Sequence, residues 1–312
     1  MKRGYYLAGL LVLLAFCSPL FAFQWITMGE VDFSKAEAKI IEVRGNIHLI
    51  EIRVPQGLYN IAVLSGPDGY LLVDHPEAAA YPMVQKALDD LGKRPVKFLL
   101  NTHWHYDHVG GNEIFGPDAT IVAQENVRKR LMTKQRPPWS PTSIGPYPER
   151  AWPRITFRDS LTIHFDDEDI EMEHYANGHT DGDSVVYFAR ANVVDLGDIF
   201  AGQRNLTGGI DMEGTARSLS AVLDRINDET IVITGHGELS NRRDLSVYIS
   251  LLEHTMVHVR KEISYGKTEK EIVDERLPEV WKPWFAPQAI PVDRDFMQAI
   301  YSTVTHTSNL DQ

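Results

Sequence analysis

Residues 101–111 read Asn-Thr-His-Trp-His-Tyr-Asp-His-Val-Gly-Gly, and no other stretch of the 312-residue chain constrains its fold so tightly. Four metal-binding side chains fall within six positions of this run: His103, His105, Asp107 and His108. Ions such as Zn²⁺ accept imidazole nitrogen and carboxylate oxygen at about 2.0–2.2 Å. Without a cation these groups would be costly to bury together, because a buried carboxylate must be paired. The run therefore predicts a metal site.

The spacing within the run indicates how these side chains divide. If the run begins at the end of a strand, His103 and His105 point to the same side, because side chains alternate along a strand. That pair can bind one ion. The chain then turns, and Asp107 with His108 can reach a second ion nearby. The two glycines that follow allow a tight turn close to the site.

The run resembles the signature of the metallo-β-lactamase superfamily, a family of αββα metallohydrolases, and three further pieces of that pattern follow in order. They are Asn177-Gly178-His179-Thr180-Asp181-Gly182-Asp183-Ser184, Leu196-Gly197-Asp198-Ile199-Phe200 and Gly235-His236-Gly237-Glu238. The resemblance covers roughly residues 40–240. It implies an α/β fold, a four-layer αββα sandwich. It is specific for fold and metal chemistry and much less so for substrate.

The resemblance also implies seven metal ligands for two Zn²⁺ ions per chain. The first ion takes His103, His105 and His179; the second takes Asp107, His108 and His236; Asp198 bridges both. A carboxylate at Asp198 is closer to the pattern of glyoxalase II, lactonases and B3-like members than to that of several true β-lactamases. Iron or manganese are alternatives to zinc, because a bridging carboxylate also suits harder ions.

The ligand set implies a mechanism of hydrolysis. Two ions about 3.5–4 Å apart can share a water and lower its pKa toward neutrality. The resulting hydroxide would attack the acyl carbonyl of a small molecule, a lactam, lactone or thioester, and the second ion can hold the leaving group. Asp107 is the catalytic residue expected to orient the hydroxide and move a proton. In the family, an Asp at the position of Asp74 supports the ligands; its neighbour His75 has no assigned role.

Two other functions are compatible with the same motif. A metal-dependent phosphodiesterase would use the same ions but would need cations near the site, and Arg204 and Arg217 are the obvious ones in the loop after Asp198. A non-catalytic metal-binding or sensing protein is the other alternative, and the complete ligand set argues against it.

The first 22 residues have the layout of a secretory signal peptide. Lys2 and Arg3 form a basic start, an apolar run follows, and Leu20-Phe21-Ala22 is an acceptable cleavage site. We therefore expect a periplasmic or secreted protein without stable membrane insertion after cleavage. An uncleaved anchor and lipidation of Cys17 are the alternatives. Cys17 is the only cysteine, so the mature chain has no cysteine ligand and no disulfide.

The formal charge of −12 would become −14 once Lys2 and Arg3 are removed. An acidic chain without a basic stripe is a poor candidate for binding nucleic acid. The sequence does not fix the oligomeric state.

Apolar patterns predict strands and helices in two halves of a domain over residues 23–240. Strands are expected near 47–52, 59–65, 70–73, 96–100, 119–123, 161–165, 170–175, 184–189, 192–196 and 231–233, with helices near 79–91, 124–132 and 215–226. The turn sequence at 66–69 predicts a hairpin. Residues 241–312 are expected to form a helical C-terminal extension packed on the domain, with a long helix after Asn241 and shorter ones near 268–276 and 294–304.

Residues 134–153 are rich in proline, contain Trp139, Tyr147 and Trp152, and show little periodicity. Long irregular loops of this kind are often lids or binding loops. A surface insertion that only packs on the domain is an equally weighted alternative.

Overall fold

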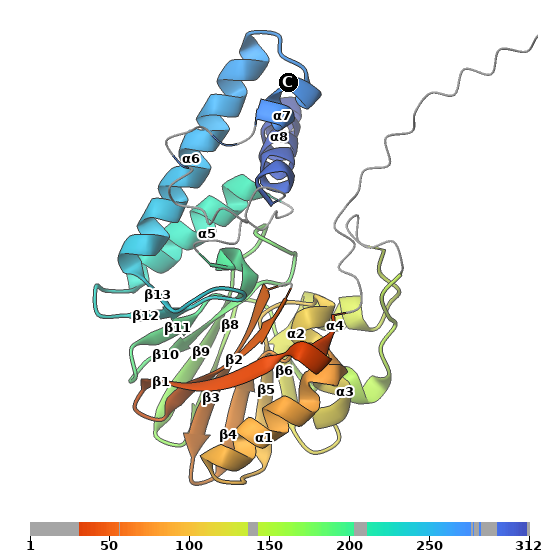
Figure 1. The fold of residues 1–312 in the computed structure, drawn as a ribbon, viewed down its shortest axis with the longest axis vertical. Coiled ribbons are helices and arrows are strands. Elements are labelled where there is room, and N and C mark those ends of the chain that lie inside the picture. The colour runs from red at the N-terminus through yellow and green to blue at the C-terminus, as the bar shows by residue number, and fades with distance from the viewer. Residues whose placement is uncertain are drawn as a thin grey trace, which may run out of the picture.

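The computed structural model describes residues 31–310 except 56, 137–142, 203–210, 276, 278–280 and 282–291. Two β-sheets lie face to face, and helices cover the outer face of each sheet (Figure 1). Further helices project from one end of this sandwich. The α/β class, the αββα layering and the C-terminal helices expected from the sequence are confirmed. The expected signal peptide at residues 1–22 lies outside the described residues.

The first sheet contains seven strands in sequence order: β1 (Glu37–Arg44), β2 (Ile47–Val54), β3 (Gly57–Gly66), β4 (Gly69–Val73), β5 (Val96–Asn101), β6 (Thr120–Gln124) and β7 (Ile155–Phe157). β1 to β4 are antiparallel, whereas β4 to β7 run parallel. The predicted hairpin forms between β3 and β4, where Ser65 pairs with Tyr70.

The second sheet has the order β13-β12-β11-β10-β9-β8. Its strands are β8 (Ser160–Phe165), β9 (Glu168–His174), β10 (Ser184–Phe188), β11 (Val193–Asp195), β12 (Ile231–Ile233) and β13 (Ser240–Asn241). β8 to β11 are antiparallel, and β11 pairs with β12 in parallel. Each sheet therefore contains a parallel pair, and the chain after these parallel strands builds much of the site.

The helices are α1 (Tyr81–Leu91), α2 (Tyr106–Val109), α3 (Asn112–Phe115), α4 (Glu125–Leu131), α5 (Met212–Arg225), α6 (Arg242–Ser264), α7 (Glu269–Glu275) and α8 (Val292–Leu310). Short 3-10 helices are η1 (Phe33–Lys35), η2 (Ala78–Ala80), η3 (Glu149–Ala151) and η4 (Gly197–Phe200). Among the described residues, no helix combines the length and the apolar character needed to cross a membrane.

Alternation along the strands explains why the two sheets stack. On β3, Ile61 and Val63 face the cluster that includes Val84 and Leu88 of α1. Ala62 and Leu64 instead belong to a cluster between the sheets, together with residues of the second sheet such as Met172 and Phe188. A strand with apolar side chains on both faces needs cover on both, and helices on one side and a sheet on the other provide it.

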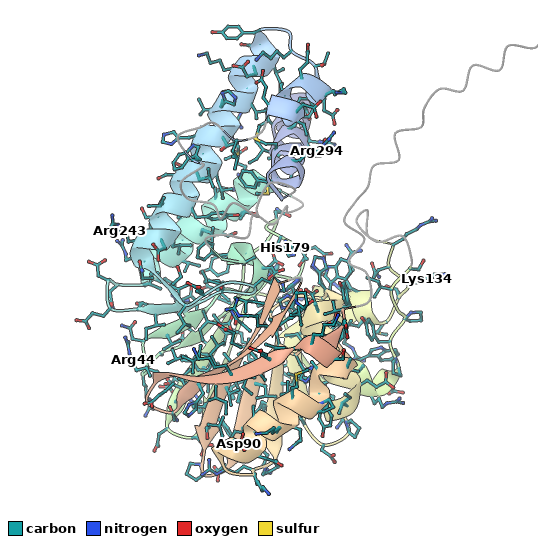
Figure 2. All side chains as sticks on the ribbon, viewed as in Figure 1. Arg44, Asp90, Lys134, His179, Arg243 and Arg294 are labelled. Carbon is teal, nitrogen blue, oxygen red and sulfur yellow. The ribbon has the colours of Figure 1, made fainter. Side chains whose placement is uncertain are left out.

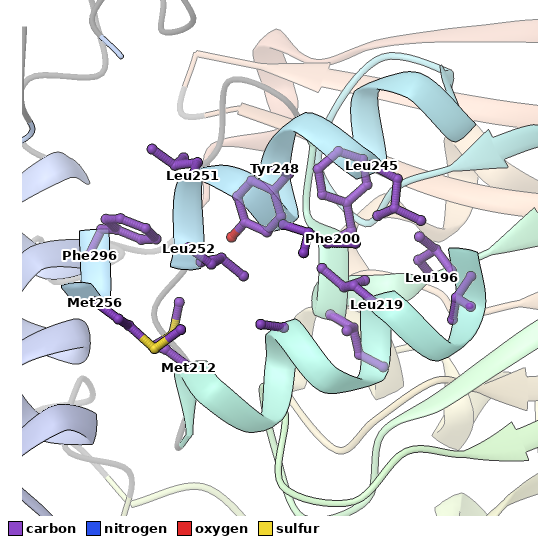
Figure 3. Packing of buried hydrophobic residues seen from close by; sticks show 14 of the residues in the cluster. Leu196, Phe200, Met212, Leu219, Leu245, Tyr248, Leu251, Leu252, Met256 and Phe296 are labelled. Atoms are coloured by element: carbon purple, nitrogen blue, oxygen red, sulfur yellow. The ribbon is translucent and has the colours of Figure 1, made fainter. Parts of the chain in front are cut away.

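The C-terminal helices share a core with the second sheet. Leu245, Tyr248 and Leu252 of α6 lie in one buried cluster with Phe200 and Leu219, as Figure 3 shows. The same cluster continues through Met256 to Phe296 and Ile300 of α8. The helical region after Asn241 thus shares one apolar cluster with α5 and the second sheet.

The structure corrects several expectations about elements. β1 was not predicted because half of its residues are charged and none is fully buried, as suits an edge strand. β7 and the short helices α2 and α3 were not predicted either. On α1 the buried residues are Val84, Ala87 and Leu88, whereas Met83 and Leu91 are only partly buried. α8 extends beyond the predicted 294–304 at both ends.

Candidate metal centre

The segments that follow two parallel strand pairs meet at one end of the sandwich. β4 ends before Asp74 and its parallel neighbour β5 ends before Thr102, so the Asp74 carboxylate accepts hydrogen bonds from the Thr102 amide and hydroxyl. In the second sheet, β11 leads to Asp198 and its parallel neighbour β12 leads to His236. Carboxyl ends of parallel strands lie at the same edge, which brings these loops together.

His179 comes from the loop between β9 and β10 (Figure 2). The Asp183 carboxylate closes this loop by accepting hydrogen bonds from the Thr180 amide and hydroxyl. The Ser184 amide donates to the Thr102 carbonyl over 2.8 Å, which ties the loop to the signature run. Residues from both sheets are thereby held in one place.

Asp198 lies at the centre of the expected ligands, and its two oxygens face different groups. Oδ2 lies 3.5 Å from His179 Nε2 and 3.9 Å from His103 Nε2. Oδ1 lies 3.3 Å from His236 Nε2 and 3.4 Å from His108 Nε2. Gly235 has no room for a side chain, because a Cβ there would lie 2.0 Å from Asp198 Oδ1.

We call His103, His105 and His179 the histidine half of the centre. Donor atoms of these residues and of Asp198 all lie within 4.8 Å of one another. The rings of His103 and His105 meet edge to face with centroids 4.6 Å apart, and His105 Nδ1 lies 2.9 Å from His179 Nε2. All three side chains are buried or nearly so.

We call Asp107, His108 and His236 the carboxylate half. Asp107 Oδ2 lies 3.2 Å from His236 Nε2 and 3.7 Å from His108 Nε2, and the two Nε2 atoms are 3.2 Å apart. Within this half the side chain of His236 is the most exposed, at 12%, whereas that of His108 is only 3% exposed.

The arrangement fits divalent cations. Two tetrahedral ligand atoms bound to one zinc at 2.0–2.1 Å are separated by about 3.3 Å, close to most distances within the carboxylate half and around Asp198. His103 Nε2 and Asp198 Oδ1 are buried without a hydrogen-bond partner. A buried polar atom without a partner is costly, so these atoms need a cation to satisfy them. All seven residues expected from the sequence are brought together.

The two halves differ in protonation. Burial, with the neighbouring histidines, lowers the pKa of His103 well below its usual value and that of His105 to about 3. Burial also opposes charge on His108 and His236. The negative charges of Asp198 and Asp107 outweigh the effect of burial on these two histidines. The pKa of His108 therefore rises well above its usual value, and that of His236 rises to about 10.

The pKa values of the two carboxylates of the centre, Asp107 and Asp198, are lowered. Burial alone would raise the pKa of Asp107 and Asp198. His108 and His236 outweigh it, and the pKa of Asp107 falls to about 2 while that of Asp198 falls well below its usual value. Both side chains therefore carry negative charge at neutral pH.

Asp74 lies behind the carboxylate half. Its Oδ2 accepts from His108 Nδ1 over 2.8 Å, which leaves His108 Nε2 to face Asp198. Asp74 can be grouped with His103 and His108 as a third possible cation site. The two oxygens of Asp74 already accept three hydrogen bonds, however. We therefore assign Asp74 the role of orienting His108 and not that of a metal ligand.

Asn60 was not singled out from the sequence. It lies on β3, and its Nδ2 donates to the carbonyls of Thr234 and Gly237, each over 2.7 Å. His236, between these residues, donates through Nδ1 to the Leu58 carbonyl over 2.7 Å. The first sheet thus fixes the His236 loop of the second. A buried polar residue within an apolar strand was the available signal.

Glu77 was also missed. It follows Asp74 by three residues, and its backbone packs against the signature run, because a Cβ on Gly110 would lie 2.6 Å from the Glu77 Cα. Burial, with Asp107, raises the pKa of Glu77 to about 7. An acidic residue just after a strand that ends at the site was the signal in the sequence.

The remaining expectations about site residues resolve as follows. His75 is buried against Phe115, and its Nδ1 donates to the Pro76 carbonyl, so it packs beneath the signature run. Arg217 pairs with Asp211 and Glu213, and Arg204 lies outside the described residues. None of the other described histidines joins a group able to hold a metal.

The described part of the proline-rich loop packs against α4. Trp152 packs with Val127 and Leu131 of α4, and its Nε1 donates to the Tyr147 carbonyl over 2.9 Å. The side chain of Tyr147 interacts electrostatically with Asp107 and Glu77. Tyr147 packs against the same apolar cluster as Trp152; Trp139 is outside the described residues.

Three comparisons with known proteins agree with this geometry. A hydroxyacylglutathione hydrolase from Crocosphaera subtropica is 25% identical over 181 residues, 55% of this chain and 62% of that protein. A metallo-β-lactamase from Pontibacter korlensis has a TM-score of 0.56 at 18% identity, covering 70% of this chain and 99% of that one. A stereoselective inverting sec-alkylsulfatase from Pseudomonas sp. reaches 0.66 at 15% identity, covering 88% of this chain and 52% of that one.

The coverage of these matches has two consequences. Since 88% of 312 residues exceeds 240, the likeness in fold to the alkylsulfatase extends into the helical region after Ser240. The chain spans less than two thirds of the length of the curated relative.

A family model described as the metallo-beta-lactamase superfamily matches residues 54–236, which hold all seven clustered residues. The clustered histidines and aspartates form groups able to hold metal ions. The chain therefore belongs to the metallo-β-lactamase superfamily.

Proposed function

We propose that the protein is an exported zinc hydrolase that holds two ions per chain and cleaves the acyl bond of a lactam, lactone or thioester. One observation carries the proposal: the two oxygens of Asp198 face separate pairs of histidines, Oδ2 the pair His103 and His179 and Oδ1 the pair His108 and His236. The histidine half would hold one Zn²⁺ and the carboxylate half the other, with Asp198 shared. The curated relative named above is a hydrolase of an acyl derivative of glutathione, which supports an acyl substrate.

Two bound zinc ions supply an activated water at neutral pH and neutralise negative charge that develops on the substrate. The chain itself contributes orientation and proton transfer. Asp107 is ionised at neutral pH, and its Oδ2 faces the interior of the carboxylate half, where it can accept a proton from the attacking water. Asp74 and the Leu58 carbonyl hold the rings of His108 and His236 in position.

Metal content tests the binuclear assignment directly. Protein stripped with a chelator, reloaded with zinc and dialysed should contain close to two zinc ions per chain by elemental analysis. One ion or none would contradict the proposal. His179→Ala should lower zinc content and lower hydrolysis by orders of magnitude. The control is His164→Ala on β8, an exposed histidine whose side chain pairs with Asp169.

A substrate screen tests the acyl bond. The zinc-loaded protein is offered nitrocefin, homoserine lactones, thioesters and bis-p-nitrophenyl phosphate, and turnover of one of the first three is expected. Turnover of the phosphodiester alone would favour the phosphodiesterase alternative. Export is tested by expression in a Gram-negative host: the periplasmic protein should begin at Phe23. An exported chain that retains residues 1–22 would favour the uncleaved anchor, and a chain found only in the cytoplasm would contradict export.

A further inference from the structure

The first turn of α5 lies against the loop that carries His179. A Cβ on Gly214 would lie only 1.8 Å from the carbonyl oxygen of Asn177, so the helix has no room for a side chain at this point. The Asp211 amide donates to the Gly178 carbonyl over 3.3 Å. The two residues that precede His179 therefore both contact the start of α5, although β10 and β11 lie between these segments in the sequence.

The His179 loop has little freedom to absorb a displacement by α5. A Cβ on Gly178 would lie 2.8 Å from Asp183 Oδ2, so the backbone of the loop is packed against the carboxylate that closes it. Beyond His179, the Asp181 carboxylate accepts a hydrogen bond from Arg130 Nη2 of α4 over 2.7 Å. Because closely packed segments transmit displacements, we expect a shift of Gly178 to move His179.

The first turn of α5 is itself held by α8. The first amides of an α-helix have no acceptor within the helix and need other partners. The Asp211 side chain, at the N-cap, accepts from the amides of Glu213 and Gly214. The amide of Met212, the first residue of the helix, donates over 3.0 Å to the hydroxyl oxygen of Thr303 on α8, and this hydrogen bond is buried. The Thr303 hydroxyl therefore completes the cap of α5.

Apolar contacts accompany this hydrogen bond. The Met212 side chain is fully buried in the cluster that also contains Phe296 and Ile300 of α8. Because α8 contacts the first residue of α5 both through a hydroxyl and through the apolar cluster, a change in α8 reaches the turn that supports the His179 loop.

We propose that Thr303 is a positioning residue of the metal centre, which acts on His179 through the first turn of α5. The inference rests on the proposed function, in which His179 belongs to the half that holds one of the two ions. It extends the scaffold of the centre to the C-terminal helices: Asp74 of the first sheet orients His108 in the carboxylate half, whereas α5 and α8 hold the His179 loop. Loss of the Thr303 hydroxyl should therefore weaken zinc binding in the histidine half and spare the carboxylate half.

Zinc affinities measured by chelator competition test this link. The zinc-binding step that His179→Ala removes identifies the histidine half. Thr303→Val keeps the shape of the side chain but leaves the buried Met212 amide without its acceptor. It should weaken the step of the histidine half about tenfold, as does loss of other groups that support a metal ligand, and leave the other step unchanged. Thr303→Ser, which retains the hydroxyl, should restore the affinity of the parent.

The control is Thr255→Val on α6. Thr255 is fully buried, and its hydroxyl donates to the Leu251 carbonyl within its own helix. Both zinc-binding steps should keep the affinity of the parent in this variant. Three results would overturn the proposal: unchanged affinity in Thr303→Val, equal weakening of both steps, or a loss that Thr303→Ser does not restore.

Gly214→Ala tests the contact between the helix and the loop directly. The added Cβ must displace the Asn177 carbonyl, so the step of the histidine half should weaken by about 100-fold. Ser220→Ala, further along α5, is the control; its hydroxyl donates to the Ala216 carbonyl within the helix, and its zinc affinity should equal that of the parent. Unchanged affinity in Gly214→Ala would contradict the inference, because the position of His179 would then not depend on α5.

Hydrogen exchange in the metal-free protein separates this inference from the proposed function. Followed by mass spectrometry, exchange of the amides of residues 177–184 should be about threefold faster in Thr303→Val than in the parent, with residues 101–111 unchanged. If it is, but the parent binds no zinc, the proposed function fails and the link stands. Exchange equal to that of the parent at 177–184 would reject the link even if two ions bind. Equally faster exchange in both segments would also reject it, as a general loss of stability.

Discussion

The histidine half and the carboxylate half of the centre use similar side chains but differ in charge and in support. The histidine half has pKa values lowered by burial and by mutual repulsion, so His103 and His105 are neutral at physiological pH. In the carboxylate half, His108 and His236 are held protonated by Asp107 and Asp198. The first half is thus ready to bind a cation, whereas the second must release protons to do so.

The two halves also differ in the contacts that hold their side chains in place. In the carboxylate half His108 is held by Asp74 and His236 by the Leu58 carbonyl, both from the first sheet. In the histidine half His103 Nδ1 lies 3.1 Å from the Thr102 hydroxyl, and His105 contacts His179. We therefore expect substitutions at Asp74 and Asn60, which lie next to His108 and the His236 loop, to act mainly on the carboxylate half.

The largest effect is expected from the residue that both halves share. Asp198→Asn removes the charge that faces four histidines, so zinc content should fall below one ion per chain. Hydrolysis of the best substrate should fall by on the order of 10³-fold, since a metal ion contributes several kcal/mol to the transition state. Elemental analysis and kcat/KM measure the two effects. Asp169→Asn, a surface carboxylate on β9, is the control; two tightly bound ions in Asp198→Asn would rule out the shared role.

Asp74→Asn should separate the halves. Loss of a carboxylate that orients a metal-binding histidine weakens metal affinity by about 10–100-fold. Because Asp74 contacts His108, only the second of two zinc-binding steps should weaken in a chelator-competition titration. Equal weakening of both steps would mean that Asp74 stabilises the signature run as a whole through Thr102.

The pH dependence of stability should also distinguish the halves in the metal-free protein. His236, with a pKa of about 10, is protonated in the folded state at pH 7–9, whereas an unfolded histidine is not. Its contribution is therefore complete below about pH 6.5 and is lost as the pH rises towards 10. His105, with a pKa of about 3, is neutral in both states above pH 7 and adds no slope there.

Denaturant unfolding at pH 7, 8 and 9 tests this difference. The free energy of unfolding should fall with rising pH in the parent and in His105→Gln, and the fall should be smaller in His236→Gln. An equal reduction of the slope in both variants would show that the halves are not distinct in charge.

The smallest effect is expected at Asn60. Asn60→Ala leaves the carbonyls of Thr234 and Gly237 without their side-chain donor, which should cost about 1–3 kcal/mol of stability. Zinc affinity in the carboxylate half should fall less than in Asp74→Asn, because His236 keeps its bond to Leu58. Asn241→Ala, which removes the N-cap of α6, is the matched control and should cost about 1 kcal/mol without changing zinc affinity.

The sequence alone was sufficient to identify the metal-binding run and the order of the motif pieces. It was also sufficient to predict most strands and helices. Residues 101–111 combine short-range spacing with one kind of chemistry, and apolar alternation in strands such as β3 is a local signal. Edge strand β1 was not predicted, because half of its residues are charged and none is fully buried. Local patterns are readable from the sequence because they depend on residues a few positions apart.

Tertiary structure alone decided how the ligand-type residues divide and what supports them. Asp198 and His236 are 38 positions apart, and only the parallel pairing of β11 with β12 places them together. The contrast in pKa between His105 and His236 likewise depends on which charged groups surround each ring, not on its neighbours in the chain. Asn60 carries no motif, and its role follows from contacts between segments distant in sequence. Burial and electrostatic interactions are set by distances in space, which the order of residues does not contain.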